Sequence, residues 1–425
     1  MPILQARPVD LRSSLQGESG RTASAGRERV GLRSVLVTSE LALAVVLLLG
    51  VGLLIKSFWR LQQVDPGFHA EGVLKAEFQL PAGRYAVNFS EWPNFPEIHG
   101  FNNTLLRRVT ALPGVKDAAI AGNHPLDAGY TNSFVVLGRE AEAENWPELS
   151  IRSVTPGYFS VLEVELIGGR LLRESDDTFA TPVLLINQAV AQRFFPDQDP
   201  LGQQIAFWGS GSARTIVGVV GNEKIHGLRQ PDPPAVYSPL AQMPTRGNES
   251  LLVRVNGDPT ALAPAVRSAI WELDPALAVF GVEPLDHTVS RSMAEQRFTV
   301  LLLGTFAALA LLLAMIGIYG VLSYSVAQRR QEIGIRMALG AERSHIASGI
   351  VREALGLGIA GTALGAAAGF GLRRVMQSLL FEVSTTDPSI FAAAAVLLIG
   401  IVLLAAWLPA RRAAGLDTMV ALRHG

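Results

Sequence analysis

The sequence lacks several residues and motifs that mark common protein classes. None of its 425 residues is a cysteine, which excludes disulfide frameworks, thiolate metal sites and cysteine nucleophiles. It contains no GxxxxGK[ST] phosphate-binding loop, so we do not expect this chain to be an ATPase. Its seven histidines are dispersed, and neither HExxH nor GxSxG occurs. We therefore predict no catalytic site and no metal site, although a triad assembled only in space would leave no such motif.

Charge is also scarce, and it is unevenly distributed. Only 17% of the residues are charged and 49% are hydrophobic, a balance typical of membrane proteins. Between Ser57 and Arg297 there are 19 Lys or Arg against 27 Asp or Glu, whereas the rest of the chain has 17 against 10. The acidic middle argues against a nucleic-acid partner, and the basic flanks suit an anionic cytoplasmic membrane leaflet.

Four long apolar stretches predict transmembrane helices. Phe298–Val326 contains no charged residue in 29 positions, and Ala354–Leu372 contains none in 19. The stretch from Ser34 has Glu40 as its only charge and lacks a cleavage site, so we interpret it as a retained anchor. The predicted segments are a cytoplasmic tail (1–33), span one (34–56), an outside domain (57–297), span two (298–326), a cytoplasmic segment (327–346), span three (347–375), an outside loop (376–387), span four (388–410) and a cytoplasmic tail (411–425).

Basic residues near the ends of the spans set the orientation, because short Arg-rich segments stay in the cytoplasm. Such residues precede span one, separate spans two and three, and follow span four: Arg27, Arg29, Arg33, Arg329, Arg330, Arg336, Arg343, Arg411 and Arg412. The large domain is therefore predicted outside. Arg373 and Arg374, after span three, are exceptions to the rule.

The outside domain shows the same local order twice. Val73–Leu80 alternates as a half-buried strand, a helix carries Ile98, Phe101, Leu105 and Val109 on one side, and a strand follows at Val115–Ala121. Ser250–Val255, a helix from Asp258, and Ala276–Val282 repeat this order. Two such units predict an α+β sandwich in which they pair.

Residues from about 139 to 245 are interpreted as a subdomain inserted between these units. Short strands, PGYF (156–159) and a helix capped by Asn187 lie among its Gly and Pro turns. Its acids lack the spacing of a cation-binding loop, and we interpret them as solvated: Glu174, Asp176, Asp177, Asp197 and Asp199.

The cytoplasmic segment RRQEIGIRMALGAERSHI (329–346) predicts a short helix over Val326–Leu339 that ends at Gly340. In such a helix Glu332 pairs with Arg336, Ile333 lies beside Met337, and Ile335 lies beside Leu339. One apolar stripe can pack on the membrane bundle while the other inserts into a groove on a cytoplasmic partner. A helix resting at the headgroup interface fits the same spacing.

Gly361, Gly365 and Gly369 form two overlapping GxxxG patterns in span three. Such a face allows two helices to approach closely, and ordinary glycine enrichment in membrane helices is the alternative. The pattern does not say whether the neighbouring helix belongs to the same chain.

Several motifs carry a family resemblance. QEIGIRMALGA (331–341), the preceding IGIYGVLSYSVAQR (316–329) and LPARRAAGLDTMVALR (408–423) resemble the permease module of MacB-like and FtsX-like ABC transporters. The resemblance covers nearly the whole chain. PGYF, residues 187–205 and TIVGVVG (215–221) resemble more closely the duplicated orphan permeases frequent in acidobacteria. The family resemblance implies an α+β membrane protein with four transmembrane helices and a MacB-like periplasmic core domain between helices one and two.

The resemblance also implies partners and roles. The segment between spans two and three would be the coupling helix that contacts an ATPase, through Arg329, Glu332, Ile333, Gly334, Arg336, Met337 and Gly340. ATP would be bound by a separate cytoplasmic subunit, and the permease would act as a pair in the bacterial inner membrane.

Two other readings stay open: an orphan membrane-anchored binding or signalling protein without an ATPase, and a hydrolase displayed outside.

A short echo at the two ends indicates a duplicated protein. Leu4–Arg7 with Asp10 and Leu15 repeats the pattern of Leu408–Arg411 with Asp417 and Leu422. We interpret the chain as the second half of a duplicated permease, with a chance match as the alternative.

Overall fold

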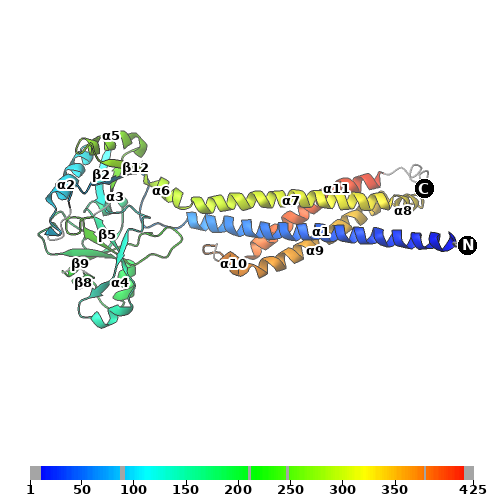
Figure 1. Ribbon diagram of the computed structural model, residues 1–425, viewed down its shortest axis with the longest axis horizontal. Coiled ribbons are helices and arrows are strands. Elements are labelled where there is room, and N and C mark those ends of the chain that lie inside the picture. The colour runs from blue at the N-terminus through cyan, green and yellow to red at the C-terminus, as the bar shows by residue number, and fades with distance from the viewer. Residues whose placement is uncertain (1–10, 87–90, 209–211, 246–247, 378–379, 416–425) are drawn as a thin grey trace, which may run out of the picture. The chain divides into compact units, whose positions relative to one another are not determined.

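The computed structural model describes residues 11–86, 91–208, 212–245, 248–377 and 380–415, which form two compact units (Figure 1). The membrane unit contains the residues up to Gln62 and those from Gln296 onward. The α+β unit contains Gln63–Glu295. Most of the terminal echo, including Asp10 and Asp417, lies outside the described residues.

All regular secondary structure in the described part of the membrane unit is helical. Its helices are α1 (Leu11–Gln62), α7 (Ala294–Gln328), α8 (Arg330–Ala338), α9 (Arg343–Gly371), α10 (Arg373–Gln377) and α11 (Pro388–Ala414). Four of the helices in the described part of the chain, namely α1 from Leu32 on, α7, α9 and α11, are long and apolar enough to cross a membrane. The four spans predicted from the sequence are therefore confirmed as helices.

Helix α9 packs against both α1 and α11, and α7 joins this bundle along one side. The interior contains Leu41 and Leu49 of α1, Ile318 and Leu322 of α7, and Leu398 of α11. The opposite side of α7 exposes large apolar side chains, which are Phe298, Leu301, Leu302, Phe306, Leu309, Leu312, Leu313 and Ile316. Such a surface is stable only in contact with hydrocarbon or another apolar helix.

Two helix boundaries differ from the expectation. The third spanning helix ends at Gly371, and α10 begins at Arg373, whereas the sequence predicted a span to residue 375. Two successive arginines are costly in hydrocarbon, which favours a helix end before them. The segment Val326–Leu339 is not one helix, because the backbone leaves helical geometry at Arg329 (φ −97°, ψ 12°) between α7 and α8.

The α+β unit is built on the two predicted strand-helix-strand repeats. The first is β1 (Val73–Gln79), α2 (Pro96–Thr110) and β2 (Val115–Ala121), and the second is β11 (Asn248–Val255), α5 (Pro259–Trp271) and β12 (Ala278–Pro284). Their strands pair antiparallel in the order β12-β1-β11-β2. The apolar sides of α2 and α5 pack on one face of this sheet around Phe78, Phe101, Leu251 and Ile270. The predicted pairing of the repeats is confirmed.

The inserted segment extends the same sheet and begins earlier than expected. Its elements are β3 (Tyr130–Asn132), β4 (Phe134–Val136), η2 (Glu140–Asn145), β5 (Leu149–Val154), α3 (Tyr158–Leu162), β6 (Leu166–Gly169), β7 (Val183–Asn187), α4 (Gln188–Phe194), β8 (Gln204–Phe207), β9 (Arg214–Val220) and β10 (Ala235–Pro239). Strands β3 and β4 pair with β5 and β8, so the insertion starts before residue 139. It joins the repeat sheet through a single residue pair, Ala121 with Val154. Helix α6 (Leu285–Ser292) follows β12 and precedes α7 along the chain.

One acid of the insertion is not solvated as expected. Asp176 is only 7% exposed and accepts two hydrogen bonds of 2.8 Å from the Arg170 guanidinium. Asp177 and Asp199 accept backbone N–H groups two residues further along, as turn-forming acids do.

Candidate functional site

Helix α8 is a short element with a defined end. The N–H of Gly340 donates to the Met337 carbonyl at 3.1 Å, and the N–H of Ala341 donates to the Arg336 carbonyl at 3.0 Å. These two bonds form a Schellman motif, which requires a left-handed residue after the helix. Gly340 supplies it with φ +92°. The helix end expected at Gly340 is therefore present, and α9 restarts at Arg343 after two residues.

The two apolar stripes of α8 have different surroundings. Ile333 and Met337 are half-buried and pack against the core of the membrane unit, with Gly334 buried between them. Ile335 is 45% exposed and Leu339 is 84% exposed. The family resemblance implies partner contact for Ile333 and Met337, which stays a prediction. In the structure these two side chains pack against their own bundle. The sequence predicts that Ile335 lies beside Leu339, and these two are the exposed apolar side chains of this segment.

Polar contacts around Glu353 of α9 link this helix to the start of α8 and to α7. Arg329 Nη1 lies 3.5 Å from Glu353 Oε2 of α9, and Ser325 Oγ of α7 donates to Glu353 Oε1 at 3.3 Å. Arg336 Nη2 donates to Glu332 Oε1 at 2.5 Å on the exposed side, the predicted i,i+4 pair. Glu353 was missed in the sequence, although an acid beside a long uncharged stretch is a usable signal.

The glycines of the third spanning helix lie against α1 of the same chain. A Cβ on Gly361 would stand 2.5 Å from Leu41 Cβ, and one on Gly369 would stand 2.9 Å from Leu49 Cδ1. At Gly365 the nearest atoms are Val45 Cβ at 2.6 Å and the Ala42 carbonyl oxygen at 2.7 Å. Separations below 3 Å leave no room for a side chain. The glycine face of α9, whose neighbour could not be predicted from the sequence, is thus packed against α1 of the same chain.

Comparisons with known proteins agree with this architecture. A family model described as MacB-like periplasmic core domain matches residues 34–273, and one described as FtsX-like permease C-terminal matches residues 304–418. An uncharacterised ABC transporter permease, YknZ of Bacillus subtilis, is 24% identical over 343 residues, which cover 78% of this chain and 81% of the relative.

Two further relatives are named as ATP-binding/permease proteins. The macrolide export protein MacB of Agrobacterium fabrum is 32% identical over 74% of this chain and 49% of its own length. A probable export protein of Pseudomonas fluorescens is 30% identical over 64% and 43%. The chain thus spans about half the length of these two relatives. The family models together cover the membrane helices and most of the α+β unit, which is extracytoplasmic in this family. The chain belongs to the MacB-like and FtsX-like family of ABC transporter permeases.

Proposed function

We propose that this chain is the permease subunit of an ABC-type transporter in the bacterial inner membrane. It transmits ATP-driven motion from a separate cytoplasmic ATPase to its α+β unit, for efflux or for mechanical work outside the membrane. The chain itself catalyses no reaction, and ATP is bound by the partner. It acts as a pair, with a second copy or with a second permease half. Family membership supports this proposal.

The proposal rests on the outward stripe of α8, which consists of the exposed side chains of Ile335 and Leu339. Leu339 and Ile335 are exposed next to the exposed Glu332–Arg336 pair, while Ile333 and Met337 fix the helix to its bundle. A helix held in this way presents two apolar anchors and one charge pair to a groove on a partner, which is the helix-in-groove mode. A rigid link between that groove and the spanning helices allows closure of an ATPase pair to shift the equilibrium of the bundle.

The experiment is co-purification from the native host. The unaltered chain should retain a nucleotide-binding subunit, and Leu339→Asp should reduce its recovery about tenfold or more, because a carboxylate has to be desolvated in an apolar groove. Phe179→Asp is the matched control, since Phe179 is equally exposed (83%) and lies in the α+β unit. Full recovery with an abundant, folded Leu339→Asp chain would favour the orphan binding or signalling protein instead.

A further inference from the structure

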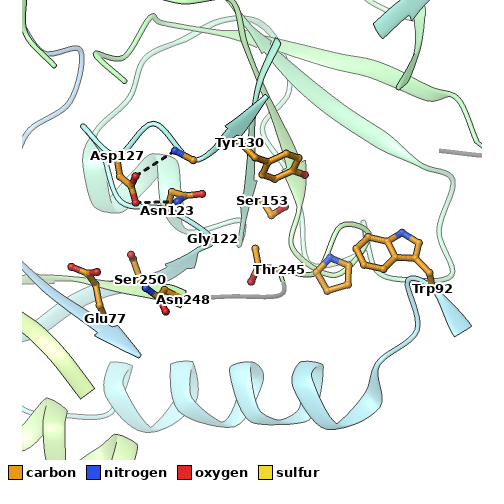
Figure 2. Close-up of a pocket in the computed structure, with 12 residues that line it drawn as sticks. Glu77, Trp92, Gly122, Asn123, Asp127, Tyr130, Ser153, Thr245, Asn248 and Ser250 are labelled. Carbon is orange, nitrogen blue, oxygen red and sulfur yellow. Dashed lines mark hydrogen bonds between the residues drawn. The ribbon is translucent and has the colours of Figure 1, made fainter. Parts of the chain in front are cut away.

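A cavity of about 640 Å³ lies in the α+β unit, where the inserted segment meets the repeat sheet (Figure 2). The two parts of the sheet meet there between β2 and β5, where Ala121 lies opposite Val154. The N–H of Gly122 donates to the Ser153 carbonyl at 2.8 Å, and the N–H of Thr155 donates to the Ile120 carbonyl at 2.9 Å. Glu77 of β1 and Ser250 of β11 line one side, while Asn123, Asp127 and Ser153 line another. The cavity shares no residue with α8 or with the membrane unit.

The buried side chain of Arg152 holds the backbone of the loop that carries Asp127. Arg152 is 2% exposed, and its guanidinium donates to the backbone oxygens of Asn123 at 3.1 Å and Asp127 at 2.9 Å. The carboxyl group of Glu223 is also buried and accepts hydrogen bonds from the hydroxyls of Tyr158 and Tyr237. The loop is therefore placed by a buried polar network and does not depend on a ligand for its shape.

The carboxylate of Asp127 is oriented by hydrogen bonds and makes no salt bridge among the described residues. Asn123 Nδ2 donates to it at 3.0 Å and the N–H of Gly129 donates at 3.4 Å, as the dashed lines in Figure 2 show. Burial alone would raise the pKa of Asp127, but these bonds and the nearby positive charges hold it below its ordinary value. Asp127 is in no ion pair among the described residues. Glu77, in contrast, is paired with Lys75 Nζ at 2.7 Å.

The far side of the cavity is aromatic. Figure 2 shows Trp92 across the space from Asp127 and Glu77, with Tyr130 between them along the upper wall. The Trp92 ring is supported by Phe95, with the ring centres 5.5 Å apart in an edge-on arrangement. Aromatic faces attract cations and pack on flat apolar groups.

The hydroxyl group of Ser153, which lies between the acidic side and the aromatic side of the cavity, has no hydrogen-bond partner among the described residues. Ser153 is among the residues that line the cavity and is 2% exposed. A buried hydroxyl without a partner costs free energy, which a polar group of a ligand would recover.

We propose that this cavity binds a small organic cation, with its protonated amine at Asp127, a polar atom at Ser153 and its apolar body against Trp92 and Tyr130. The described lining carries the carboxylates of Glu77 and Asp127, which favour a cation over an anion. Among the described residues no group of three acids or histidines is placed to hold a metal ion, which disfavours an inorganic cation. The inference does not rest on the ATPase partner, because binding is a property of this chain alone.

The test is calorimetric titration of the full chain in zwitterionic lipid nanodiscs, with heats from empty nanodiscs subtracted. The probes are 1-naphthylmethylammonium, its neutral alcohol isostere and 1-naphthylacetate. Saturable binding of the cation, with both isosteres at least about tenfold weaker, is expected from the loss of one charged contact. Equal binding of the alcohol, or no saturable binding of the cation up to about 1 mM, would overturn the proposal.

Variants locate the site. Asp127→Asn should weaken binding of 1-naphthylmethylammonium about tenfold, because it removes the charge that contacts the amine. Trp92→Leu should weaken binding by a similar factor, because it removes the aromatic ring that contacts the naphthyl group. Glu144→Gln, which removes one charge from an exposed position of η2, should leave the affinity unchanged. Unchanged affinity in folded Asp127→Asn would also overturn the proposal. If that variant fails to fold, the comparison of cation and alcohol on the unaltered chain decides the same question.

Discussion

Gly365 of α9 lies directly on Val45 of α1, because a Cβ at position 365 would stand 2.6 Å from Val45 Cβ and 2.7 Å from the Ala42 carbonyl oxygen. One of these neighbours is backbone and cannot rotate away. Gly365→Ala should therefore push the two helices apart and destabilise the membrane unit by about 2 kcal/mol, the usual cost of overpacking. Thermal unfolding of the purified chain in detergent measures this effect.

Gly356→Ala is the control for that prediction. Gly356 lies on the same helix, and a Cβ there would meet nothing within 4 Å. Helix propensity alone makes this change neutral or slightly stabilising. Equal melting temperatures of the two variants would show that the α1–α9 contact is not as close as described.

The buried Glu249 of β11 should make the unfolding free energy depend on pH. Its residue is 1% exposed, Thr245 Oγ1 donates to Oε1 at 2.8 Å, and Oε2 has no partner among the described residues. Burial raises its pKa from 4.5 to about 7, although the hydrogen bond from Thr245 and the nearby side chain of Asn102 oppose the shift. Because the folded pKa lies above the unfolded one, the unfolding free energy should fall as pH rises from about 4.5 to 7, by about 3 kcal/mol.

Chemical denaturation of the full chain at a series of pH values checks this prediction. Glu249→Gln should remove most of the dependence and raise stability at neutral pH, since an amide pays no cost of ionisation. Glu97→Gln, at an exposed position of α2, is the matched control and should keep the unaltered slope. A pH profile of Glu249→Gln that matches that of the unaltered chain would contradict the assignment.

Lys75 provides a third prediction, because it is the buried centre of a charge cluster. It is 3% exposed, and its Nζ lies 2.7 Å from Glu77 Oε1 and 3.6 Å from Glu283 Oε1. Glu283 in turn binds Arg291 of α6 through two hydrogen bonds of 2.8 and 3.1 Å. Lys75→Met should leave two carboxylates under-compensated and destabilise the α+β unit by about 3 kcal/mol. Lys116→Met, at an exposed position of β2, should change stability by less than about 0.5 kcal/mol. A loss of similar size in both variants, measured by denaturation, would refute the prediction.

Regular periodicity explains which parts of this fold could be predicted. The alternation in Val73–Gln79 and the four-residue spacing of Val266 and Ile270 placed both elements within a few residues of their observed bounds. The expectation that the strand is half-buried was wrong, because Val73 packs in a second core and Lys75 is buried in a charge cluster on its other face. The uncharged spans were equally clear, because hydrocarbon demands about twenty apolar residues in succession. Strands β3 and β4, in contrast, have three residues each, which is too short for any alternation to be recognised.

The sites were less predictable, because they depend on which segments meet in space. The α8 segment could be found from its position between two spans, and its two stripes from helical spacing. Which stripe faces outward follows from the packing of Ile333 and Met337, which spacing alone does not give. The lining of the cavity comes from separate segments around Glu77, Trp92, Asp127 and Ser153. No sequence motif connects these residues, because they meet only where the insertion joins the repeat sheet.

The outward stripe of α8 is tested most directly by a photo-crosslinking residue at position 339, with the same residue at position 337 as the inward-facing control. Irradiation in living cells and mass spectrometry identify what each position captures. We predict that position 339 captures a nucleotide-binding subunit and that position 337 captures only this chain. Capture of lipid or of this chain alone at position 339, with the protein abundant and folded, would contradict an ATP-coupled permease.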